Sequence, residues 1–415
     1  MNQRNNRRLV LFPVPFQGHI NPMLQLAQIL HNRGFSITIL HTDLNLSIHP
    51  RTPTSPFAPS AMASANRRCA APFEERLREE VSSPDGRDAP VTCLIADALF
   101  RFTWDVAERA GVRRMVLRTG ESRLEDPVPE FPPLQVKDLP GINTAEPELL
   151  DQLLHDMTEG IKDSSGVILN TFEDLEEISS RNFPIGPFHK CGPSSSGSLL
   201  AEDRSCISWL DEQAPNSVVY VSFGSIATVG ESEFSEIALG LADSQQPFLW
   251  VVRPGSVGGS ELLEKLPSCF LEALEERGKI VKWAPQQEVL AHRAVGAFWT
   301  HNGWNSTLES ISEGVPMICM PCFSDQKVNA RFVSDVWGVG VHLNNGLERR
   351  KIAEAIRKLL VEKEGEEVRE RAAQFKEKAN SCLRQGGSSF RSLDGLANHI
   401  LSSESFVFGS NKSSA

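Results

Sequence analysis

Short runs of hydrophobic residues recur along the chain and alternate with stretches of helical character. The runs of the first half lie at residues 8–14, 35–41, 91–97, 114–119 and 165–170. They show no polar alternation, which is typical of strands buried on both faces. Between two of them, the stretch NPMLQLAQILHNRG has hydrophobic residues at helical spacing and ends in glycine. Strands that alternate with helices predict an α/β fold with parallel sheets covered on both faces.

The same pattern starts again after a segment rich in proline, glycine and serine. A second series of hydrophobic runs begins with SVVYVSFGS, and a length of 415 residues exceeds that of one ordinary domain. We therefore expect two Rossmann-like domains with a cleft between them, and ligands bound beyond the carboxyl ends of the strands. The expected parts are an N-terminal domain at 1–185, a linker at 186–205, a C-terminal domain at 206–390, a helix at 391–402 and a disordered tail at 403–415.

Composition narrows the range of partners. The formal net charge of -11 and the pI near 5.5 argue against nucleic acid or an anionic membrane, because both attract a basic surface. The sequence begins without a hydrophobic signal segment, and no hydrophobic stretch of about 18 residues occurs. The eight cysteines are scattered, as in proteins of a reducing compartment. We expect a cytoplasmic monomer that does not insert into a membrane.

A turn with the sequence HNGWNS connects one hydrophobic run of the second half to a helical stretch. It places His301 and Trp304 in the turn, with Asn305 and Ser306 in the first turn of the helix. The backbone amides and the dipole at the start of a helix favour an anion such as phosphate, and these side chains would add donors. Ser306 and Glu309 also have the spacing of a capping box, which would explain both without a ligand.

Further polar or aromatic residues follow two neighbouring runs. Trp283 closes a strand in KWAPQQEVLAH, where it either packs in the core or stacks on a flat base. Asp325 and Gln326 follow another strand, and a carboxylate beside an amide is a common way to hold sugar hydroxyls. A dipeptide of this kind has little specificity by itself.

The first half contributes a histidine and an aspartate at the ends of two predicted strands. His19 follows the first strand and precedes the first helix, and Asp97 ends the strand at 91–97. A lone loop histidine is usually polar surface, and Asp97 alone could be a helix cap. Together they could form a general base, because a carboxylate fixes the tautomer of a histidine and stabilises its protonated form.

The stretch from Trp283 to Gln326 closely resembles the signature box of plant family 1 UDP-dependent glycosyltransferases. It is 44 residues long, begins with WAPQ, contains HNGWNS and ends in DQ. The resemblance implies the GT-B fold, in which two Rossmann-like domains face each other across a cleft. It also implies a UDP-sugar held mainly by the C-terminal domain as a co-substrate, with no cofactor and no metal ion. Gln326 together with Trp304 is more similar to the users of UDP-glucose.

The resemblance assigns a part of the donor to each residue of the box. Trp283 would stack on uracil, the backbone of Ala284 would pair with its edge, and Gln286 and Glu309 would hold the ribose. The residues expected at the diphosphate are His301, Asn305, Ser306 and Ser225. Those expected around the sugar are Trp304, Asp325 and Gln326, and Thr119 would contact either the sugar or the catalytic pair.

The GHINP setting of His19 and the position of Asp97 match the catalytic pair of the same family. The implied reaction is a direct displacement, in which His19 takes a proton from the acceptor while Asp97 orients it, and the anomeric centre is inverted. The acceptor would be a small lipophilic molecule that carries a hydroxyl or carboxyl group. The N-terminal half is shorter than in the family, after HTDLNLSIHP and between Gly120 and Glu121.

Two other functions compete with an active transferase. The shortened acceptor side could leave a non-catalytic or weakly active UDP-sugar binder, since small displacements of reacting groups reduce catalysis strongly. Paired Rossmann-like domains would also suit a nicotinamide-dependent oxidoreductase, but no G-x-G-x-x-G follows a strand here.

Overall fold

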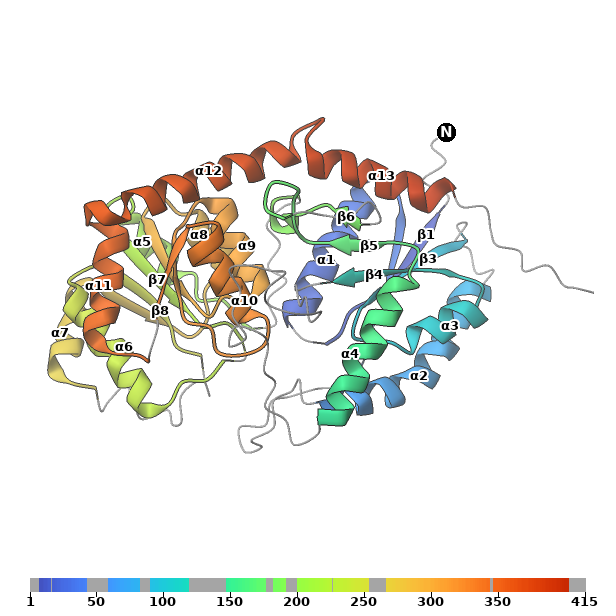
Figure 1. Ribbon diagram of the computed structural model, residues 1–415, viewed down its shortest axis with the longest axis horizontal. Helices are drawn as coiled ribbons and strands as arrows, with labels where there is room; N and C mark the ends of the chain where they lie inside the picture. Colours follow the sequence, from blue (N-terminus) through green and yellow to red (C-terminus); the bar gives the residue numbers. More distant parts are fainter. Residues whose placement is uncertain are drawn as a thin grey trace, which may run out of the picture. The chain divides into compact units, whose positions relative to one another are not determined.

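The chain folds into two compact units in the computed structural model (Figure 1). The residues that the structure describes are 7–15, 17–42, 59–82, 90–118, 147–176, 182–191, 200–225, 227–253, 266–343 and 346–402. The first unit takes in those up to Arg118, those from Pro147 to Cys191 and those from Leu383 onward, and the second takes in those from Leu200 to Cys382. Part of the expected linker and the whole of the expected tail lie outside the described residues.

The first unit is built on a six-stranded parallel sheet with the strand order β2-β1-β3-β4-β5-β6. Its strands are β1 (Arg8–Phe12), β2 (Ser36–Ile39), β3 (Val91–Asp97), β4 (Arg113–Arg118), β5 (Val167–Leu169) and β6 (Asn182–Pro184). Its helices are α1 (Gln17–Asn32), α2 (Pro59–Ser82), α3 (Thr103–Arg109), α4 (Pro147–Lys162), the 3-10 turn Phe188–Lys190 and α13 (Ser388–Ser402).

Neighbouring residues of β1 bury two separate hydrophobic clusters. Leu9 and Leu11 pack into the cluster covered by α1 and α13, whereas Val10 and Phe12 pack into the cluster covered by α2 and α3. All four side chains are at most 2% exposed. Both faces of the strand are therefore covered, which explains why its sequence is an unbroken hydrophobic run.

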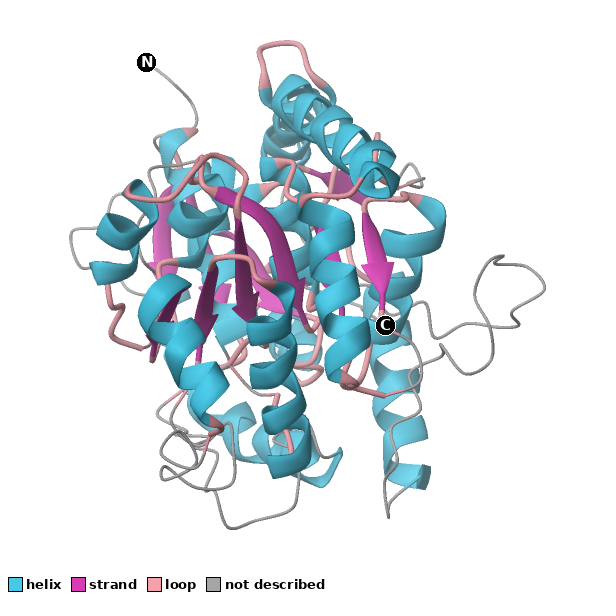
Figure 2. Cartoon of the chain, turned by 90° about the vertical axis from the view of Figure 1, so that its left-hand side faces the viewer, coloured by secondary structure: helices cyan, strands magenta, loops and turns pink. Residues whose placement is uncertain are grey.

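The second unit repeats this architecture with the strand order β12-β11-β10-β7-β8-β9, again all parallel. Its strands are β7 (Val218–Ser222), β8 (Phe248–Val251), β9 (Gly278–Val281), β10 (Val295–Thr300), β11 (Met317–Cys319) and β12 (Gly340–His342). Its helices are α5 (Ser205–Asp211), α6 (Glu231–Ser244), α7 (Ser268–Arg277), α8 (Gln286–Ala291), α9 (Trp304–Glu313), α10 (Gln326–Arg331), the π-helical turn Phe332–Val336, α11 (Arg349–Leu360), the 3-10 turn Lys363–Gly365 and α12 (Glu366–Leu383). Figure 2 shows strands of this sheet lying between layers of helices. The predicted α/β architecture with two parallel sheets is confirmed.

In each sheet the chain reverses the direction in which it adds strands. In the first sheet, β2 pairs with one side of β1 and β3 pairs with the other. In the second, β8 and β10 pair with opposite sides of β7 in the same way. Sheets of this kind bind ligands at the carboxyl ends of the two strands between which the direction reverses. These strands are β1 and β3 in the first sheet and β7 and β10 in the second.

The last helix belongs to the core of the first unit. The sequence predicts a helix at 391–402, and the structure has α13 from Ser388 to Ser402. Leu396 and Ile400 of α13 are at most 1% exposed and lie in the same hydrophobic cluster as α1. None of the helices in the described parts of the chain is both long and apolar enough to cross a lipid bilayer.

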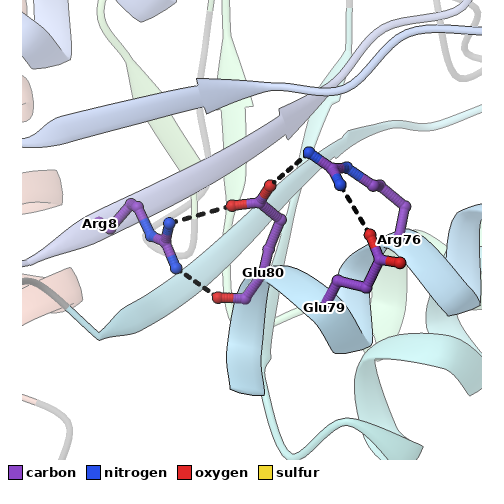
Figure 3. Close-up of polar contacts among 4 residues, drawn as sticks. All are labelled: Arg8, Arg76, Glu79 and Glu80. Carbon is purple, nitrogen blue, oxygen red and sulfur yellow. Dashed lines mark hydrogen bonds and ion pairs between the residues drawn. The ribbon is translucent and has the colours of Figure 1, made fainter. Parts of the chain in front are cut away.

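A buried ion pair joins the end of α2 to the start of β1 (Figure 3). The Arg8 guanidinium contacts the Glu80 carboxylate at 3.0 Å, and their side chains are 5% and 6% exposed. Arg8 also donates to the Glu80 backbone carbonyl, and Arg76 reaches the other carboxylate oxygen at 2.9 Å. Arg76 makes a second pair, with Glu79, that is more than half exposed on both sides. Glu79 and Glu80 thus both pair with Arg76, but the Glu79 side chain is exposed whereas the Glu80 side chain is buried.

We expect Glu80→Ala to lower the free energy of unfolding by about 3 to 5 kcal/mol, because it leaves the Arg8 charge buried without its carboxylate. Glu79→Ala is the matched control, and it should cost about 0 to 1 kcal/mol because water screens the exposed pair. Urea denaturation followed by circular dichroism measures both. An equal decrease in the free energy of unfolding in the two variants would show that the buried ion pair stabilises the fold no more than the exposed one.

Candidate functional site

His19 and Asp97 meet at the carboxyl ends of β1 and β3. Asp97 is the last residue of β3 and is 1% exposed, and its Oδ2 lies 2.7 Å from His19 Nδ1. The other carboxylate oxygen accepts a hydrogen bond from the Leu99 backbone N–H at 3.0 Å. The expected position of His19 before the first helix is wrong, since it lies in the first turn of α1. When Nδ1 carries the proton that Asp97 accepts, Nε2 carries the lone pair of the neutral ring.

The second group of predicted residues surrounds the turn between β10 and α9. His301 follows directly on β10, and two glycines pack against its imidazole. A Cβ atom on Gly224 would lie 2.6 Å from His301 Cε1, and one on Gly303 would lie 2.7 Å from Nε2. Gly224 also has a φ of +71°, which a side chain would strain. The two glycines therefore hold the ring in one place.

The environment of His301 keeps its ring uncharged. Burial lowers the pKa of His301 to about 4, so that the ring is neutral at pH 7 and offers one N–H donor. Its Nδ1 atom is buried and has no hydrogen-bond partner within the described parts of the chain. A buried polar atom of this kind is usually satisfied, so a bound ligand is a natural partner for it.

The capping-box interpretation of Ser306 and Glu309 is wrong. The N-cap of α9 is Gly303, and no side chain caps the helix. The Glu309 carboxylate instead accepts hydrogen bonds from Gln286 Nε2 at 2.8 Å and from Gln287 Nε2 at 3.0 Å. Burial raises the pKa of Glu309 despite these two donors. The carboxylate is thus held by α8 and not by its own helix.

Gln286 is the centre of this network. Its Nε2 also donates to Ser306 Oγ at 2.9 Å, and its Oε1 accepts from the Tyr220 hydroxyl at 3.3 Å. Sequence reasoning missed Tyr220 and Gln287. Tyr220 is the only tyrosine in the chain and stands inside a hydrophobic run, which is a signal that could have identified it. The network brings together three predicted residues from α8 and α9, namely Gln286, Ser306 and Glu309.

Asp325 and Gln326 lie at the start of α10. Gln326 is 4% exposed, and its Oε1 accepts hydrogen bonds from the backbone N–H groups of Cys322 and Phe323 at 2.9 and 3.0 Å. These bonds fix the orientation of the amide and leave Nε2 as its donor. Asp325 Oδ2 accepts a hydrogen bond from Asn329 Nδ2 at 2.9 Å, a contact that sequence reasoning also missed.

The two predicted tryptophans differ in their surroundings. Trp283 is half-buried after β9, and its carbonyl accepts a hydrogen bond from the Asp203 backbone N–H at 2.8 Å. Trp304 is 6% exposed, with its ring centroid 6.4 Å from that of Trp337. Stacking on a base by Trp283 and sugar contact by Trp304 stay predictions.

The remaining predicted residues lie close to these groups, with one exception. Ala284 is 4% exposed beside Trp283, Asn305 is half-buried in the first turn of α9, and Ser225 directly follows Gly224. Thr119 lies outside the described residues.

Comparison with known proteins places this arrangement in a family. The model of the family "UDP-glucoronosyl and UDP-glucosyl transferase" matches residues 198–372. UDP-glycosyltransferase 76B1 of Arabidopsis thaliana is 47% identical over 97% of this chain and 100% of the relative. That alignment runs over 450 residues, more than the 415 of this chain, so the relative contains segments that this chain lacks.

Solved structures share the fold. The crystal structure of Os79 from O. sativa in complex with UDP is 29% identical, with a TM-score of 0.80 over 94% of this chain and 100% of that one. A second structure of Os79, in complex with U2F and trichothecene, is 30% identical, with a TM-score of 0.78 over the same shares.

We expect Gly224→Ala to raise the pKa of His301 from about 4 toward the ordinary histidine value, because the new Cβ would overlap the ring and force it out of its buried position. Titration of the histidine ring signals by NMR, in protein with labelled histidine, measures the shift. Gly230→Ala is the control, since its Cβ would have only one ordinary contact, at 3.5 Å from Glu233. An unchanged His301 titration in Gly224→Ala would contradict the packing argument.

Proposed function

The chain belongs to the plant family 1 UDP-dependent glycosyltransferases, and on this premise we propose that it transfers glucose from UDP-glucose to a small lipophilic acceptor. The accepting group is a hydroxyl or a carboxyl, and the anomeric centre is inverted. The observation that carries the mechanism is the 2.7 Å contact between His19 and Asp97 at the end of β3.

The proposed role of His19 is that of the general base. With its Nδ1 proton held by the buried Asp97 carboxylate, the ring takes the acceptor proton at Nε2 as the acceptor oxygen attacks the anomeric carbon. Asp97 stabilises the imidazolium that forms and fixes the orientation of the ring. A base of this kind contributes about 100-fold to 10,000-fold to the rate.

The proposed diphosphate site is the first turn of α9. The backbone amides at the start of a helix favour an anion, and Ser306 and His301 stand at the same turn. A phosphate oxygen would supply the partner that His301 Nδ1 lacks among the described residues. These donors would meet the charge that develops on the leaving UDP, in place of a metal ion.

The proposed sugar and ribose contacts follow from the donors and acceptors that the side chains offer. Gln326 has its Nε2 donor available in a fixed orientation, and Asp325 offers a carboxylate, so together they match hydroxyl groups that both donate and accept. Gln286 and Glu309 offer the same combination for the ribose. The preference for glucose rests on the resemblance of the signature box.

The proposed acceptor and location have separate support. Os79 binds trichothecene in one of its structures, which supports a small-molecule acceptor for this chain. All eight cysteines are free thiols, which supports a reducing compartment such as the cytoplasm.

The first test is product formation. Purified protein is incubated with UDP-glucose and a mixed panel of lipophilic alcohols, phenols and carboxylic acids, and the products are identified by mass spectrometry. We expect products that are heavier by one hexose, with UDP-galactose giving less in a parallel reaction. Thermal stabilisation by UDP with no product from any acceptor would contradict the proposal.

The second test separates catalysis from donor binding. His19→Ala should lower kcat at least about 100-fold, because no base remains to take the acceptor proton. Its affinity for UDP, measured by calorimetry, should stay within about twofold, because the proposed UDP contacts are made by other residues. His31→Ala, an exposed histidine of the same helix, is the control and should keep full activity. Turnover retained by His19→Ala would rule out the proposed base.

A further inference from the structure

A single buried amide connects two parts of the donor site that are more than twenty residues apart in sequence. Asn329 lies on α10, one helical turn after Asp325, and is 2% exposed. Its Nδ2 donates to the backbone carbonyl of Asn302 at 2.9 Å and to Asp325 Oδ2 at 2.9 Å. An amide nitrogen has two hydrogens, so both are used by these two acceptors.

One end of this connection is the turn that holds His301. Asn302 is fully buried and has a φ of +61°, a left-handed conformation that costs free energy for a residue other than glycine. Its backbone N–H donates to Thr300 Oγ1 at 3.2 Å, and its side-chain amide donates to Cys319 Sγ at 3.4 Å. The bond from Asn329 to its carbonyl adds a restraint on the same peptide.

The other end is the carboxylate of Asp325. This residue precedes α10, yet its side chain does not cap the helix. The carboxylate is turned toward Asn329 instead, one turn further along. The Asn329 amide therefore contributes to the orientation in which Asp325 would meet a sugar hydroxyl.

We propose that Asn329 is a positioning residue that couples the diphosphate turn to the sugar-binding carboxylate. The inference deepens the proposed function and rests on the donor site assigned there. Asn329 does not contact the donor itself in this proposal. It holds Asn302, and with it His301 and the start of α9, in register with Asp325. Without this amide, both the Asn302 turn and the Asp325 carboxylate are less restrained. The affinity for the nucleotide part of the donor and the affinity for its sugar part therefore both fall.

The test compares the binding of UDP with the binding of UDP-glucose, both without acceptor, by calorimetry. We expect Asn329→Leu, which keeps the approximate size but has no donor, to weaken UDP about tenfold and UDP-glucose about 100-fold. The additional loss of affinity for UDP-glucose reports the contact between Asp325 and the sugar, because UDP has no sugar at that position. In kinetic assays the KM for UDP-glucose should rise while the KM for the acceptor stays constant.

Ser244→Ala is the matched control. Ser244 is fully buried in the same unit and also makes two hydrogen bonds, to the Leu241 carbonyl at 2.7 Å and from the Gln246 N–H at 3.2 Å. Its removal should lower the unfolding temperature as Asn329→Leu does, while both ligand affinities stay within about twofold.

Asn329→Asp provides a second variant if the leucine does not fold. It keeps the shape of the side chain but places an acceptor against the Asn302 carbonyl and the Asp325 carboxylate, so the same order of losses is expected. Unchanged affinities, or equal factors for UDP and UDP-glucose, in a folded variant would overturn the coupling. Failure of the unaltered protein to bind UDP-glucose would overturn the proposed function instead.

Discussion

All strands of a parallel sheet end at one edge, and the side chains of the candidate site depend on that constraint. In each unit the chain adds strands toward one edge of the sheet and then toward the other. In sheets of this kind, the segments that follow the two central strands diverge and leave a crevice between them at the carboxyl ends of those strands. His19 follows β1, and Asp97 is the last residue of the neighbouring strand β3. Ser225 and His301 follow β7 and β10 of the second sheet. Residues far apart in sequence therefore gather without any special loop.

The side chains of the candidate site are held in fixed orientations by the protein itself. Glycines fix the His301 ring, two glutamines hold Glu309, and backbone amides hold Gln326. Groups that are already oriented lose little conformational entropy on binding, and they need not reorganise when charge develops on the leaving group. The same site contains two costly features, which are the left-handed Asn302 and the buried Nδ1 atom of His301 that has no partner among the described residues.

The hydrophobic pattern predicted the α/β architecture and its parallel sheets, because strands buried on both faces leave an unbroken run in the sequence. It did not predict the three-residue strand β6 (Asn182–Pro184), which is too short to leave such a run. The local contacts of the site were harder to predict. The spacing of Ser306 and Glu309 suits a capping box, but Gly303 occupies the N-cap, and Gln286 and Gln287 approach from another helix. Partners so distant in sequence leave no periodic signal. Asn329 is different, because its spacing of four residues from Asp325 on a helix could have revealed that contact.

The place of α13 in the fold has a consequence for biosynthesis. Leu396 and Ile400 complete the hydrophobic cluster under α1, although they stand at the opposite end of the chain. A domain made only of the first half of the sequence would leave this cluster uncovered as it emerges from the ribosome. The second unit, whose described residues are contiguous in sequence apart from short gaps, can complete its core earlier. The cluster at the start of the chain is therefore completed only when its last helix has been synthesised.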